Sequence, residues 1–220
     1  MLLLGIVQAL FEGSMFIFVF MWTPALEGAH TVATGGATGH EALPHGMVFA
    51  CFMACIMLGS RGLQALLAHS SPELVATGAF AAAACLLAVP IAFATSEGHV
   101  MLAFCGFEMV CGMYFPLVGI QRSHIVPEAM RSMLMNVFRI GLNAVVMAVL
   151  LNIGSMQQDT VFMLCAGCLT VACAAQLRLY SLSDVRRGGK EVEADMQGPK
   201  GSEGVASVHG GDIVRTEACG

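Results

Sequence analysis

Three charged side chains interrupt long apolar stretches of this 220-residue sequence, and simple packing does not explain them. Glu12, Glu108 and Arg139 each lie within a run of residues that is otherwise mostly apolar. A charge at the centre of a membrane-spanning helix costs about 2.5–3.5 kcal/mol on insertion scales, so such a residue usually faces a protein interior or a water-filled cavity. We therefore treat these three residues as candidate functional groups.

Polar neighbours extend two of these positions along a helix face. Gln8 and Glu12 are four residues apart, and Asn136, Arg139 and Asn143 follow the spacing i, i+3, i+7. Both spacings place the side chains on one side of a helix. A guanidinium between two amides offers fork-shaped donors and positive charge, which suits an oxyanion. The sequence therefore predicts Arg139, Asn136 and Asn143 as substrate-binding residues.

Other interpretations of the charged residues stay open. Arg139 is also able to form a structural ion pair with Glu108 or Glu12, or to extend its long side chain to the membrane interface. A buried carboxyl group can exchange a proton near neutral pH, or it can serve as a permanent counter-ion. We predict a role in gating or proton coupling for Glu12, Glu108 and Gln8, and the sequence does not decide which.

The composition indicates a protein solvated mainly by lipid. Charged residues make up 11% of the chain, whereas soluble domains carry about 25%. This excludes an ordinary soluble enzyme, and the net charge of −5 gives no reason to expect nucleic-acid binding. No stretch alternates as a membrane strand would, so the expected fold class is an all-α membrane protein with six transmembrane helices. The predicted spans are approximately residues 2–26, 45–67, 74–95, 99–120, 133–153 and 160–182.

The basic residues predict the topology. Of the ten Lys and Arg residues, all except Arg139 fall near the end of the second or sixth span, in the connection after the fourth span, or in the tail. By the positive-inside rule, both termini are cytoplasmic. Trp22 and Pro24 are typical of the membrane-interface end of the first span. We expect residues 1–183 to form a six-helix transmembrane bundle and residues 184–220, which are rich in Gly, Glu, Lys and Ser, to form a disordered cytoplasmic tail.

Signals for metals, cofactors and catalysis are weak. A predicted outer loop over residues 27–44 contains His30 and His40, and His45 directly follows it. These histidines either bind a metal or sense pH, or the loop is simply flexible. Cys165 and Cys168 have the C-x-x-C spacing, but no second pair frames a zinc site. No nucleophile triad or Gly-rich phosphate loop is present. We predict no metal, no cofactor and no enzymatic activity.

Several sequence blocks resemble one family. Residues 8–26, QALFEGSMFIFVFMWTPAL, resemble the seventh span of the molybdate-anion transporter family of the major facilitator superfamily. Residues 45–60 resemble its eighth span, residues 103–116 its tenth, and residues 126–143 the loop and eleventh span. The blocks occur in family order, and the likeness covers about residues 5–180. One departure is Gly141, where family members usually have proline.

The resemblance implies a fold and a function. It implies a plasma-membrane carrier that moves molybdate by alternating access, and it places this chain as the second six-span half of a twelve-span protein. Because Met1 falls within the first helix of that half, we expect a truncated carrier whose partner is the missing N-terminal half or a second copy. Two alternatives remain: a major facilitator carrier of another small solute, and a six-span membrane protein that transports nothing.

Overall fold

The computed structural model describes residues 2–35, 43–125, 136, 140, 143–144, 146–152 and 156–196. Its described part is helical, and five helices are long and apolar enough to cross a membrane. These helices are α1 (Leu2–Ala33), α2 (His45–Leu67), α3 (Pro72–Ala92), α4 (Glu97–Ile125) and α6 (Gln158–Met196). The chain divides into two compact units, Met1–Ser183 and Asp184–Gly220.

The first two helices differ in how well the sequence predicts them. Helix α2 has the predicted bounds, 45–67. Helix α1 does not end near Pro24 as expected, because it continues through this proline to Ala33. Membrane helices tolerate an internal proline when neighbouring groups satisfy the freed backbone. The helix is therefore seven residues longer than the first span that the sequence predicts, 2–26.

The boundaries of the later helices also shift. A short connection follows α2, and α3 begins where the Ser71 side chain accepts a hydrogen bond from the Leu74 amide, with Pro72 in the first turn. Helix α4 runs from 97 to 125, beyond the predicted end at 120. Of the predicted fifth span, 133–153, the structure describes residues 136, 140, 143–144 and 146–152, and all of these are helical.

The final helix corrects the predicted tail boundary. Helix α6 continues to Met196, so residues 184–196 are helical although we expected the disordered tail to begin at 184. Residues 197–220 lie outside the described part, so the rest of the tail stays a prediction.

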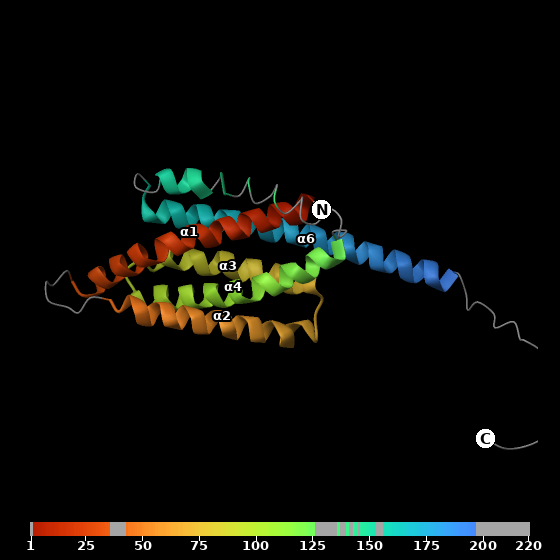
Figure 1. Cartoon of the computed structure of the whole chain (residues 1–220), viewed down its shortest axis with the longest axis horizontal. Coiled ribbons are helices and arrows are strands. Elements are labelled where there is room, and N and C mark those ends of the chain that lie inside the picture. The colour runs from red at the N-terminus through yellow and green to blue at the C-terminus, as the bar shows by residue number, and fades with distance from the viewer. Residues whose placement is uncertain are drawn as a thin grey trace, which may run out of the picture. The chain divides into compact units, whose positions relative to one another are not determined.

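Helix α4 organises the bundle, since it packs against α1, α2 and α3 (Figure 1). In its contact with α2, the main chains of the two helices come close together at two glycines. A Cβ atom at Gly59 would overlap the Met109 carbonyl, and one at Gly112 would overlap the Ile56 carbonyl. Each glycine therefore admits the main chain of the other helix. This mutual fit fixes the position of α4 against α2.

An aromatic layer joins α4 to the other neighbours. Phe11 of α1 stacks on Tyr114 with ring centroids 4.1 Å apart, and Phe18 lies edge-on to Phe104 at 5.0 Å. Phe104 in turn stacks on Phe162 of α6. Large apolar side chains such as Leu102 are exposed on the opposite faces. That distribution suits a bundle surrounded by lipid tails.

Candidate functional site

A polar contact lies between α1 and α4, near the end of the bundle where α2 connects to α3. The Tyr114 hydroxyl donates a hydrogen bond to Glu12 Oε1 at 3.0 Å. Arg122 Nε donates to Gln8 Oε1 at 3.1 Å, and its Nη2 lies 3.8 Å from the same Glu12 oxygen. One guanidinium, one carboxylate, one amide and one phenol thus converge. We call these four residues the α1–α4 polar cluster.

The cluster is largely shielded from solvent, but some of its N–H donors form no hydrogen bond. Gln8 is 4% exposed, and the side chains of Glu12 and Arg122 are 18% and 27% exposed. The Gln8 Nε2 group is buried and has no hydrogen-bond partner among the described residues. Within that part of the chain, the Nη groups of Arg122 donate no hydrogen bond either. The cluster therefore offers unpaired donors beside a positive charge.

Helical spacing explains how the cluster forms. Gln8 and Glu12 share one face of α1, as the sequence predicts. Tyr114 and Arg122 are eight residues apart on α4, which again gives one face. Arg122 was expected in the connection after the fourth span. That expectation is wrong, because α4 extends to Ile125 and the side chain of Arg122 turns back toward α1.

Glu108 lies apart from this cluster. It is on α4, 9% exposed, among buried neighbours such as Phe107 and Cys111. Its carboxylate forms no hydrogen bond or ion pair with any other described residue. The structure therefore separates the two acids that the sequence predicts together: Glu12 has partners on α4, whereas Glu108 has none in the described part.

The predicted substrate-binding residues are only partly described. Asn136 and Asn143 are both helical and both exposed. Arg139 lies outside the described residues, as does Gly141, so the predicted pairing of Arg139 with Glu12 or Glu108 stays a prediction. Within the described chain, the ion-pair partner of Glu12 is Arg122.

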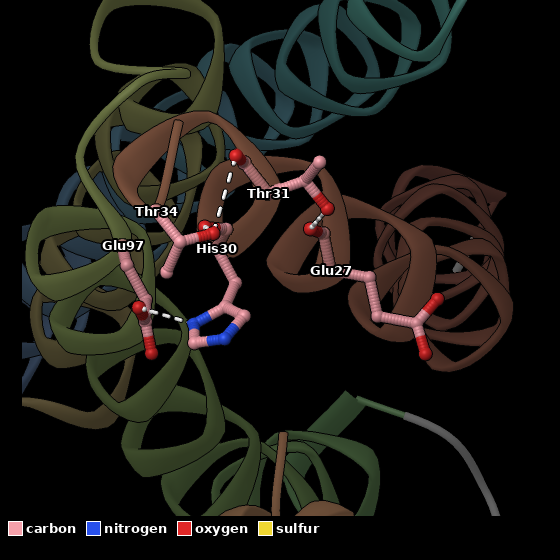
Figure 2. Close-up of polar contacts among 5 residues, drawn as sticks. All are labelled: Glu27, His30, Thr31, Thr34 and Glu97. Atoms are coloured by element: carbon pink, nitrogen blue, oxygen red, sulfur yellow. Dashed lines mark hydrogen bonds and ion pairs between the residues drawn. The ribbon is translucent and has the colours of Figure 1, made fainter. Parts of the chain in front are cut away.

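The other end of the bundle carries two histidine–carboxylate contacts. His30 Nδ1 of α1 lies 2.8 Å from Glu97 Oε2 of α4, whereas Glu27 points away from it (Figure 2). Glu27 instead lies 3.0 Å from His45 Nε2 of α2. His30 was expected in a loop, but α1 extends far enough to include it. His40 lies outside the described residues, and no cluster of three or more metal-ligand side chains occurs among the described ones.

Comparison with known proteins places the chain in a family. A major facilitator family model described as sugar transporters with 12 transmembrane segments matches residues 1–114. The chain belongs to this major facilitator family. It is an integral membrane protein, as its apolar helices and its relatives indicate. No solved structure matches it.

The curated relatives narrow the resemblance. The chain is 33% identical to the molybdate-anion transporter of Danio rerio, 31% identical to that of Takifugu rubripes and 30% identical to that of Xenopus tropicalis. These alignments cover 90–92% of the chain. They cover only 42–44% of the relatives, so the chain spans less than half of their length.

Sequence reasoning missed two members of the α1–α4 polar cluster. Tyr114 and Arg122 are spaced as one helix face, which is a readable signal, but the expected end of the fourth span at residue 120 left Arg122 outside any helix. Their partners on α1 depend on the packing of two helices, which periodicity along one chain does not supply.

Proposed function

We propose that the chain forms one half of a membrane carrier for molybdate, a tetrahedral oxyanion. The observation that carries the proposal is the likeness to three molybdate-anion transporters over at least 90% of the chain. The partly buried guanidinium and unpaired amide donor of the α1–α4 polar cluster support it, because an anion needs such groups in an apolar bundle.

The architecture we propose is a six-span half of a twelve-span carrier. Five of the six spans correspond to helices of the described structure that are long and apolar enough to cross a membrane. The remaining one is the predicted fifth span, 133–153. The other half is either a segment homologous to the remaining length of the relatives or a second copy of this chain. Substrate would lie between the two halves, and rocking of one against the other would give alternating access.

The substrate contacts we propose on this half are Arg139, Asn136 and Asn143. The exposure of Asn136 and Asn143 supports this, because a cavity wall is exposed when its partner half is absent. Glu12 and Gln8 would act in gating by holding a cation when the site is empty. Glu108, which has no partner in the described part, would carry a proton or pair with Arg139.

The membrane orientation we propose follows from the charges. Both termini would face the cytoplasm, since the basic residues gather on that side. The plasma membrane is the location implied by the family resemblance.

A carrier of a neutral solute is the second candidate, because the matching family is described as sugar transporters. A sugar carrier would not need a partly buried arginine close to an unpaired amide donor. Competition separates the two candidates: tungstate and sulfate compete with molybdate at an oxyanion site, whereas a sugar competes only at a neutral one.

The experiment is uptake of radioactive molybdate by cells that express the chain, alone or with the N-terminal half of the Danio rerio relative. An antibody against the tail reports whether the native product is near 23.1 kDa or about twice that mass. We expect saturable uptake that tungstate inhibits and that Arg139→Lys reduces, since lysine lacks the planar fork. Uptake equal to that of cells without the chain, in both arrangements, would overturn the proposal.

A further inference from the structure

We infer that Arg122 is an oxyanion-binding residue, and that the Glu12 carboxylate is its internal occupant when no substrate is bound. The inference rests on the proposed function for the identity of the anion, and it adds a binding site that the sequence did not assign. The site comprises the Nη groups of Arg122 and the Nε2 group of Gln8. Its competitor is Glu12, which Tyr114 holds nearby.

The donors in this site exceed the acceptors they meet. A guanidinium has five N–H donors, and Arg122 uses only Nε in a hydrogen bond, to Gln8 Oε1. The same hydrogen bond fixes the orientation of the Gln8 amide, so the unpaired atom is the donor Nε2. A buried donor without a partner costs free energy. An oxyanion with several acceptor oxygens would satisfy both groups at once.

The ion pair between Glu12 and Arg122 is long, so an anion is able to replace the carboxylate beside the guanidinium. Their closest atoms are 3.8 Å apart, beyond hydrogen-bond distance, whereas the Tyr114 hydroxyl lies at 3.0 Å from the same carboxylate oxygen. Glu12 is therefore held more closely by tyrosine than by arginine. When it leaves the guanidinium, it keeps the hydrogen bond to Tyr114.

Charge explains why the exchange is favourable. A partly buried guanidinium without a counter-ion is costly, so the empty bundle needs the Glu12 carboxylate. Molybdate, a tetrahedral dianion, supplies more negative charge than the carboxylate and a matching pair of oxygens, because the arginine fork fits both groups. Glu12 is thus a competitor for the site, and its removal should tighten anion binding.

The test measures binding of radioactive molybdate to the purified full chain in lipid nanodiscs at low chloride. We expect Arg122→Gln to weaken binding by about tenfold or more, since a charge-assisted bidentate contact is lost. Arg122→Lys should weaken it about threefold or more, because the charge stays and the fork is lost. Glu12→Gln should strengthen binding by about threefold or more, because the competing charge is gone.

Matched controls test for a general charge effect. Arg178→Gln removes an exposed arginine of α6, and Glu27→Gln removes an exposed acid at the far end of the bundle. Both should bind molybdate as the wild type does. Arg122→Lys and Glu12→Gln keep the inference testable if Arg122→Gln does not fold.

The outcomes separate this inference from the proposed function. Weaker binding by the Arg122 variants together with tighter binding by Glu12→Gln supports the inference, whether or not the chain transports. Binding that is unchanged in Arg122→Lys, or weakened in Glu12→Gln, overturns it, even if uptake by the wild type confirms the carrier. Sulfate at equal concentration shows whether the site accepts tetrahedral oxyanions in general.

Discussion

The two interfaces of α4 are built on different principles. Against α2, the main chains meet at Gly59 and Gly112, where an added Cβ would overlap a carbonyl of the other helix. Against α1, Glu12, Tyr114 and Arg122 meet through side-chain hydrogen bonds and an ion pair. At the first interface the two glycines leave no room for a side chain, whereas the second contains an unpaired donor beside a charged pair. We infer that the α2–α4 interface fixes the helix and the α1–α4 interface carries the chemistry.

The largest expected effect comes from the α2–α4 interface. Gly59→Ala places a methyl group against the Met109 carbonyl, so the helices must separate. Overpacking of this kind costs about 1–3 kcal/mol, and we expect a lower midpoint of thermal unfolding in detergent. The matched control is Gly62→Ala, whose Cβ would meet only the tip of Met113 at 3.8 Å. Equal unfolding midpoints for the two variants would show that the backbone contact does not fix the helices.

A smaller effect is expected from the α1–α4 interface. Arg122→Gln leaves the Glu12 carboxylate without its cation, whereas the double variant Arg122→Gln with Glu12→Gln leaves no charge. We expect the single variant to be less stable than the double variant by about 1 kcal/mol. Both side chains are partly exposed, so solvent screening limits the difference. A double variant less stable than the single one would mean that the Glu12 carboxylate stabilises the bundle through Tyr114 and does not need the arginine.

The smallest effect is expected at the other end of the bundle. His45 and Glu27 are exposed, and an exposed pair contributes about 0–1 kcal/mol. His30 and Glu97 are more buried, and their contact joins α1 to α4. We expect His45→Gln to leave the midpoint of thermal unfolding unchanged and His30→Gln to lower it slightly. A larger drop of the midpoint for His45→Gln than for His30→Gln would show that the more buried contact does not stabilise the bundle more.

The sequence predicts the spans better than their ends. Apolar length alone identifies the segments that became α1, α2, α3, α4 and α6, and the bounds of α2 are as predicted. Pro24 misled the prediction of the first boundary, because a proline that would end a helix in water is tolerated inside a membrane span. Proline as a signal for the end of a helix is typical of soluble proteins, and it is less reliable for a helix surrounded by lipid.

The sequence predicts which residues of the candidate site share a face of one helix, but not which residues of two helices meet. The shared face of Gln8 and Glu12 follows from their spacing, and the structure places both against Arg122. The identity of that cation did not follow, because it depends on where α4 ends and on how it packs against α1. Arg139 keeps its predicted role as a proposal, since it lies outside the described residues.

The two tyrosines of the chain allow the most direct test of the account. Tyr114 belongs to the α1–α4 polar cluster, and Tyr180 lies on α6 as a built-in control. Fluorotyrosine labelling should give one fluorine NMR signal for each, and Tyr114→Phe assigns them. We predict that molybdate shifts the Tyr114 signal and leaves the Tyr180 signal in place. If molybdate shifts neither signal, or shifts both equally, the α1–α4 interface does not respond to the anion and the account is contradicted.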